Sequence, residues 1–167
     1  TAEIYTLSLH DALPIFGTSM TAETAGAADD RRRASVLSAM WIFAMFNYLY
    51  ADVMTLMQAE VLQGFLAGQV GGMRITPAFL LAAAVLMETA IAMTLLSRIL
   101  ARKPNRILNI VAGILHTAAV GGSLFAGTGE VAPFYLFCAV IEMACTVFIV
   151  GYAWTWKARS PELAAAV

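Results

Sequence analysis

The chain has 167 residues, of which 60% are hydrophobic and only 13% are charged, and its formal net charge is −1. A domain of this length still exposes much of its surface, and soluble domains have about one quarter of their residues charged. The composition therefore predicts that a lipid bilayer surrounds part of the chain. The near-neutral charge, without a basic patch interleaved with aromatic residues, indicates no nucleic acid as a partner.

The N-terminal segment differs from the rest of the chain. Residues 1–15 resemble a translated sequencing adapter, because the run from Glu3 to Ile15 matches the translation of a common adapter residue for residue. We therefore interpret residues 1–19 as an artefact-derived segment and exclude them from reasoning about the fold. We expect the native chain to begin at Met20, followed by a disordered cytoplasmic leader over residues 20–34, which begin with small, polar and acidic side chains.

Four apolar stretches follow, each long enough for a helix to cross the hydrocarbon core, which needs about 20 residues. Their hydrophobicity is continuous rather than alternating, which favours helices over a membrane β-barrel. The predicted spans are residues 35–57, 77–99, 107–125 and 131–156. Because the links between the last three are short, the sequence predicts an all-α membrane domain over residues 35–157, built as an up-down four-helix bundle. Residues 158–167 are then a cytoplasmic tail.

The longest connection, residues 58–76, has a pattern of its own. Val61, Leu62, Phe65 and Leu66 are spaced for one apolar helical face, and three glycines follow at positions 68, 71 and 72. This pattern predicts a short helix on the membrane surface and then a flexible turn.

The positions of Lys and Arg predict the orientation. All of them except Arg74 lie before the first span, between the second and third spans, or after the fourth. Positively charged loops stay in the cytoplasm. We therefore expect a bacterial inner-membrane protein with both termini in the cytoplasm.

Each span carries a strongly polar residue near its middle, where such a residue is costly and usually faces other helices or a cavity. These residues are Asn47, Glu88, His116 and Glu142. Counted from the outer ends of the spans at about 1.5 Å per residue, the four lie within about one helical turn of the same depth. Asp52 lies nearer the outer end, and Tyr48 precedes it on the same face of the helix.

Small and semi-polar residues accompany three of these positions. Ala84 and Ala92 flank Glu88 at helical spacing, and small residues let a neighbouring helix approach closely. Asn109 and Gly113 share a face with His116, and Tyr135, Cys138 and Cys145 share one with Glu142. We therefore expect these faces to point into the bundle, with Cys138 and Cys145 acting as small hydrophobic residues.

Several chemistries fit the residues of the layer. Glu88, His116 and Glu142 have the donor types of a transition-metal site in a helical bundle. They also suit a proton relay, since imidazole and carboxyl groups exchange protons. Carboxylates could hold a cationic substrate, and His116 or Tyr48 could donate a hydrogen bond to a flat apolar ligand. In the structural alternative, the polar residues bond to one another and fix the register of the helices.

One segment of the first span carries a family resemblance. The run from Leu37 to Asp52, Leu-Ser-Ala-Met-Trp-Ile-Phe-Ala-Met-Phe-Asn-Tyr-Leu-Tyr-Ala-Asp, resembles the opening of an uncharacterised family of bacterial four-helix inner-membrane proteins. Glu88, the basic link after it and His116 are more distantly similar to DoxX-type four-helix proteins. The first resemblance covers roughly residues 35–157 and implies an inner-membrane setting, but it transfers no catalytic residues.

Three functions remain open from the sequence. A protein that handles a small molecule, protons or ions would use the layer formed by Glu88, His116 and Glu142. A membrane redox or metal-binding protein or subunit would bind its metal with the same residues. A structural or partner-binding protein, such as a homo-oligomer, would use them for assembly only. The sequence names no cofactor, ligand or reaction, and it leaves open whether the protein is an enzyme.

Overall fold

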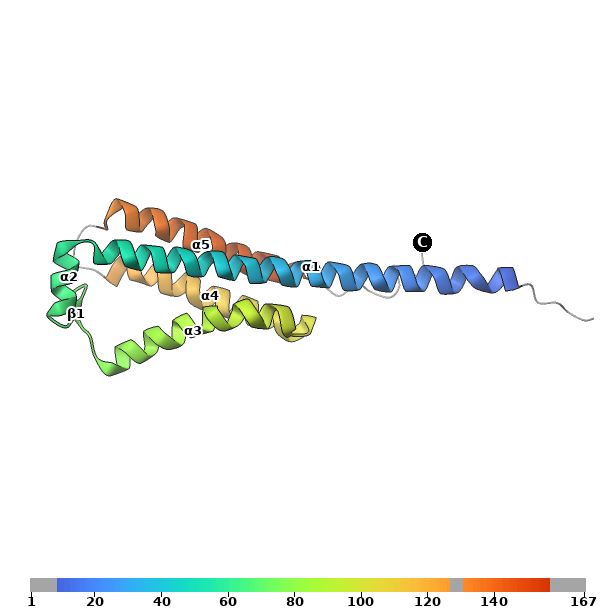
Figure 1. Cartoon of the computed structure of the whole chain (residues 1–167), viewed down its shortest axis with the longest axis horizontal. Coiled ribbons are helices and arrows are strands. Elements are labelled where there is room, and N and C mark those ends of the chain that lie inside the picture. The colour runs from blue at the N-terminus through green and yellow to red at the C-terminus, as the bar shows by residue number, and fades with distance from the viewer. Residues whose placement is uncertain (1–8, 127–130, 157–167) are drawn as a thin grey trace, which may run out of the picture.

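The computed structural model describes residues 9–126 and 131–156, with side chains from residue 24 onward except that of residue 126. This part of the chain is helical apart from one short hairpin (Figure 1). In chain order its elements are α1 (Leu9–Leu56), α2 (Ala59–Leu66), β1 (Gln69–Val70), β2 (Met73–Arg74), α3 (Pro77–Ile99), α4 (Arg102–Ala126) and α5 (Pro133–Trp154). Helices α1, α3, α4 and α5 are long and apolar enough to cross a membrane. The predicted helical protein with four apolar helices is therefore confirmed.

Helix α1 extends far beyond the predicted first span toward the N-terminus. It begins at Leu9 and includes residues 20–34, for which we expected a disordered leader. That expectation rested on composition, whereas Asp30 and Arg33 in this segment contact a distant part of the chain. Residues 1–8 of the adapter-like segment lie outside the described residues, as do residues 127–130 and the expected tail at 158–167.

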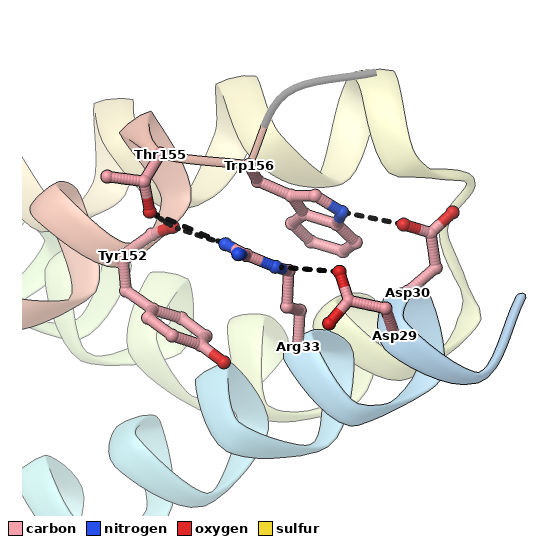
Figure 2. A network of polar contacts seen from close by, with 6 residues as sticks. All are labelled: Asp29, Asp30, Arg33, Tyr152, Thr155 and Trp156. Atoms are coloured by element: carbon pink, nitrogen blue, oxygen red, sulfur yellow. Dashed lines mark hydrogen bonds and ion pairs between the residues drawn. The ribbon is translucent and has the colours of Figure 1, made fainter. Parts of the chain in front are cut away.

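Those contacts join α1 to the end of α5. We call them the α1–α5 clamp, which consists of Asp29, Asp30, Arg33, Tyr152, Thr155 and Trp156 (Figure 2). Arg33 Nε pairs with Asp29 Oδ2 at 3.2 Å, and Arg33 also donates to Thr155 Oγ1 at 3.4 Å. Trp156 Nε1 donates to Asp30 Oδ1 at 2.8 Å. The clamp holds Asp29, Asp30 and Arg33 of α1 against residues 152–156.

Local sequence signals explain where the other long helices begin. Thr76 caps α3 by accepting a hydrogen bond from the Phe79 amide at 3.1 Å, and Pro77 occupies the first helical position. Pro133 occupies the first helical position of α5. Helix α4 begins at Arg102, earlier than the predicted span of residues 107–125, because charged and polar residues can continue a helix beyond the hydrocarbon core. Helix α3 occupies the same residues as the predicted second span, residues 77–99.

The connection between α1 and α3 contains the predicted short helix, α2, followed by a defined hairpin in place of a flexible turn. Strands β1 and β2 pair antiparallel, with Gln69 opposite Arg74. Gly71 and Gly72 form the two-residue turn, with φ values of 54° and 81°. A two-residue turn with positive φ at both positions suits the twist of a hairpin and favours glycine there.

The four long helices do not pack equally tightly. Helix α5 packs extensively on α4 and on α1, whereas α3 packs on α1 and meets α4 more sparsely. Gly113 shows how close α4 and α5 come, since a Cβ atom there would lie 2.6 Å from Val150 Cγ2 and 3.3 Å from the Thr146 carbonyl oxygen. Helix α3 diverges from the other three toward the end of the bundle that carries α2, which we call the α2 end (Figure 1).

Candidate functional site

A cavity of about 150 Å³ lies among the four long helices, on the side where α3 diverges. Every long helix contributes to its wall. The lining residues are Tyr48, Ala51 and Asp52 of α1, Leu86 and Met87 of α3, His116, Ala119, Val120 and Ser123 of α4, and Tyr135 and Glu142 of α5. Four of the residues predicted from the sequence, Tyr48, Asp52, His116 and Glu142, therefore share one cavity.

The imidazole of His116 and the phenol of Tyr48 form the most deeply buried part of the wall. His116 is only 1% exposed and Tyr48 only 5%. Their rings stack with centroids 5.6 Å apart, and the ring of Trp41 meets the imidazole edge-on at 5.3 Å. Within the described part of the chain, neither His116 Nε2 nor the Tyr48 hydroxyl has a hydrogen-bond partner. These two buried polar atoms are left unsatisfied by the part of the chain that the structure describes.

The carboxyl group of Glu142 lies in the same cavity and is held by α1. Glu142 is 6% exposed, and Asn47 Nδ2 donates to its Oε1 at 3.0 Å and to the Cys138 carbonyl oxygen at 3.1 Å. Asn47 thus positions Glu142 without lining the cavity itself. Asp52 is exposed and also lines the cavity, close enough to Glu142 for their charges to interact.

Two further hydroxyl groups line the cavity, those of Ser123 and Tyr135. The sequence did not indicate that these two groups form a pair. The Tyr135 hydroxyl donates to Ser123 Oγ at 2.8 Å, and Ser123 Oγ donates to the Val120 carbonyl oxygen at 2.7 Å. Heptad spacing was the available signal, because Ser123 follows His116 by seven residues and Tyr135 precedes Glu142 by seven. Residues at that spacing share a face of a helix.

Glu88 does not join this group. It is exposed, as are Ala84 and Ala92, so the small-residue face of α3 points away from the bundle. Helix α3 instead buries Ala90, Met93 and Ser97. The inward placement of Glu88 is therefore wrong, because small residues mark a face that permits close approach without saying which neighbour approaches.

Because Glu88 lies apart from His116 and Glu142, these three residues do not form the metal-binding set considered from the sequence. Among the described residues, no three His, Cys, Asp or Glu side chains are grouped so that they could hold a metal ion. The polar groups that do line the cavity are one imidazole, two phenols, one serine hydroxyl and two carboxyl groups. That arrangement suits a bound polar molecule better than a coordinated metal.

A second polar cluster, near the link between α3 and α4, has a different character. We call it the Asn109 cluster, which consists of Trp41, Ser97, Asn105 and Asn109. Trp41 Nε1 donates to Asn109 Oδ1 at 2.8 Å, and Asn109 Nδ2 donates to Asn105 Oδ1 at 2.7 Å. Asn105 Nδ2 in turn donates to the Ser97 carbonyl oxygen at 2.6 Å. This cluster joins α1, α3 and α4 and is fully hydrogen-bonded, as expected for structural contacts.

The comparisons with known proteins agree with the sequence on the kind of family. A model of DUF6326, described as a family of unknown function, matches residues 27–164. The chain belongs to this family. The match confirms the predicted membership of an uncharacterised family. No curated protein and no solved structure matches the chain. The DoxX likeness stays a prediction.

Proposed function

We propose that this member of the DUF6326 family is a multi-pass protein of the bacterial inner membrane that handles a small polar solute, together with protons, in the cavity between its long helices. The observation that carries the proposal is the pair of buried, unpartnered atoms in that cavity, His116 Nε2 and the Tyr48 hydroxyl. A buried polar group without a partner costs about 1–3 kcal/mol. A bound solute that hydrogen-bonds to both atoms would recover this free energy.

Protons belong to the proposal because two groups that can exchange them line the same cavity. Glu142 and His116 face it from neighbouring helices, and Asp52 faces it as well. A proton that moves between a carboxyl group and an imidazole changes the charge of the site, and with it the affinity for a charged solute. Solute binding and proton binding would therefore be coupled.

The distribution of basic residues supports an orientation for this cavity. Arg33 and Arg106 contact the same end of α5, through Tyr152 and Trp154 respectively. The positive-inside rule assigns such a basic end to the cytoplasm. We therefore propose that both termini are cytoplasmic, that the helices run up and down, and that the α2 end faces the opposite side of the membrane.

A solute screen on the purified protein in lipid nanodiscs tests the proposed function. The probes are isobutylammonium, isobutyrate and isobutanol, which share one carbon skeleton and differ in charge. At least one should raise the unfolding temperature saturably, and the rise should be lost in Tyr48→Phe and His116→Phe. Glu88→Gln is the matched control, because Glu88 lies outside the cavity and should leave the rise intact. Binding that no cavity variant weakens would contradict the proposal.

A second candidate function, lateral binding of a partner, is favoured by the position of Glu88. Its side chain is exposed in the middle of α3, where an ionisable group facing lipid is costly. A second copy of the chain packed on this face could satisfy it, and Ala84 and Ala92 would permit close approach. Chemical crosslinking in nanodiscs should then detect a dimer that Glu88→Leu weakens. An unchanged dimer, or a monomer in both proteins, would count against this candidate.

A further inference from the structure

We infer that the solute is a small organic cation with N–H donors, of the protonated primary amine class. This inference rests on the proposed solute-binding role and adds the identity of the ligand's functional group. It follows from counting which cavity atoms can still donate a hydrogen bond and which can only accept one.

When Glu142 and Asp52 are ionised, the carboxyl side of the cavity consists of acceptors. Glu142 already accepts from Asn47, whose amide protons are both engaged, one with Glu142 and one with the Cys138 carbonyl oxygen. Asn47 therefore has no proton left for a ligand. Glu142 and Asp52 supply the two acidic groups of the wall, and none of the described lining residues is Lys or Arg. An anionic ligand would face these carboxylates without a counter-charge, which is a repulsive arrangement.

The imidazole adds a further acceptor. Burial favours the neutral form of the His116 imidazole. An N–H donor in the cavity would select the tautomer whose proton is on Nδ1. A neutral imidazole that donates through one nitrogen accepts through the other. His116 Nε2, which has no partner among the described residues, then presents a lone pair to the cavity.

The hydroxyl groups leave one free donor. The Tyr135 proton goes to Ser123, and the Ser123 proton goes to the Val120 carbonyl oxygen. Only the Tyr48 hydroxyl has an uncommitted proton. The cavity therefore offers acceptors on three sides, from Glu142, Asp52 and His116, against a single donor. A ligand that complements it must donate several hydrogen bonds and carry positive charge, as a primary ammonium group does with its three N–H bonds.

The rest of the wall limits the size and shape of the ligand. Ala51, Leu86, Met87, Ala119 and Val120 give an apolar surface that can cover a short alkyl chain. The volume of about 150 Å³ is below the range of roughly 300–1,000 Å³ typical of pockets for drug-sized ligands. A short alkylammonium fits these limits. A metal cation fits less well, because no three ligand-type side chains of the described residues group together.

Four probes in nanodiscs at neutral pH test the inference: isobutylammonium, isobutyrate, isobutanol and tetramethylammonium. The last has the same charge and the same number of heavy atoms as isobutylammonium but no N–H donor. Isobutylammonium should raise the unfolding temperature saturably, whereas isobutyrate and tetramethylammonium should not. Glu142→Gln should weaken its binding about tenfold or more, since hydrogen bonds to charged groups contribute about 1.5–3 kcal/mol.

Two further variants keep the result interpretable. Asp52→Asn changes an exposed residue, so it should fold even if Glu142→Gln does not, and it should also weaken isobutylammonium binding. Glu88→Gln makes the same chemical change as Glu142→Gln at a similar depth outside the cavity and should have no effect on binding.

The possible outcomes separate the inference from the proposed function. Equal binding of tetramethylammonium and isobutylammonium would overturn the requirement for N–H donors. Suppose that isobutylammonium does not bind, but that isobutanol or isobutyrate binds and this binding is lost in Tyr48→Phe and His116→Phe. The inference of a cationic ligand would then be wrong, whereas the proposed solute binding would stand. If none of the four probes binds, both proposals fail.

Discussion

Helix α4 carries two buried polar residues, Asn109 and His116, on one side and two turns apart. Their hydrogen bonding differs. Asn109 enters a cluster in which the described side chains satisfy one another, with Trp41, Ser97 and Asn105 as partners. His116 enters a cavity where its Nε2 has no partner among the described residues. Trp41 touches both, since its N–H bonds to Asn109 and its ring meets His116. Asn109 and His116 thus lie on the same helix, are both buried and share Trp41 as a neighbour.

The difference separates a buried polar residue that the described chain satisfies from one that it leaves available to a ligand. Both kinds are buried and both are costly in lipid. The structural kind is complete without a ligand, because each donor meets an acceptor from another helix. The kind to which His116 belongs is incomplete among the described residues, which is the basis for proposing that a solute binds there. Variants that remove one group or the other should therefore affect stability with opposite signs.

The largest effect is expected for Asn109→Leu. The substitution leaves Trp41 Nε1 and Asn105 without their partners in a buried site, and each orphaned group costs about 1–3 kcal/mol. The free energy of unfolding in mild detergent should fall by about 2–4 kcal/mol, as measured by denaturant titration. If Asn109→Leu unfolds at the same denaturant concentration as the wild type, the Asn109 cluster is not a structural element.

Tyr48→Phe should act in the opposite direction. It removes a buried hydroxyl that has no partner among the described residues and keeps the ring that stacks on His116. The ligand-free protein should become more stable by up to about 1–2 kcal/mol, because the desolvation cost disappears. Trp41→Phe is the matched control, since it removes a satisfied N–H and should destabilise. A loss of stability in Tyr48→Phe would show that the hydroxyl is satisfied after all.

A smaller effect is expected for the contact between Asn47 and Glu142. A double-mutant cycle of Asn47→Ala and Glu142→Leu should give a coupling energy of about 0.6 and at most about 1.7 kcal/mol, as found for hydrogen bonds between membrane helices. Unfolding of the two single variants and the double variant supplies the measurement. Additive effects would mean that Asn47 positions Glu142 weakly or not at all.

The smallest effect on the isolated chain is expected for Glu88→Gln. The side chain is exposed on α3 and has no hydrogen bond or ion pair with the described residues. Because the substitution breaks no contact with the described residues, it should lower the free energy of unfolding by less than about 0.5 kcal/mol, and it can raise it by removing a costly charge from lipid. A change as large as that of Asn109→Leu, in a chain shown to be monomeric, would place Glu88 inside the bundle.

The sequence was sufficient for the helices and for part of the site. Length and hydrophobicity located the four apolar helices, and prolines marked the starts of α3 and α5. The period of 3.6 residues located Glu142, His116 and Tyr48 on faces with other polar residues. These signals are local, so they can be read from one segment at a time.

What the sequence could not provide is which face of a helix its neighbours cover. Glu88 and Glu142 occur in similar surroundings, Glu-Thr-Ala and Glu-Met-Ala, at similar depths, yet one is exposed and the other is buried. The difference arises because α3 packs mainly against α1, whereas α5 lies between α1 and α4. Residues 29–33 were misjudged for the same reason, since the partners that contact them lie at the end of α5.

The α1–α5 clamp has a mechanical consequence for the cavity. Helix α1 is one unbroken helix of 48 residues, and it includes both Arg33 in the clamp and Asn47 beside Glu142. At about 1.5 Å per residue these positions are about 21 Å apart along one stiff rod. A twist or pull applied beyond the clamp would travel along the rod and displace Asn47 and Tyr48 together. A change in the position of Arg33 would therefore reach Asn47 and Tyr48, although Arg33 itself does not line the cavity.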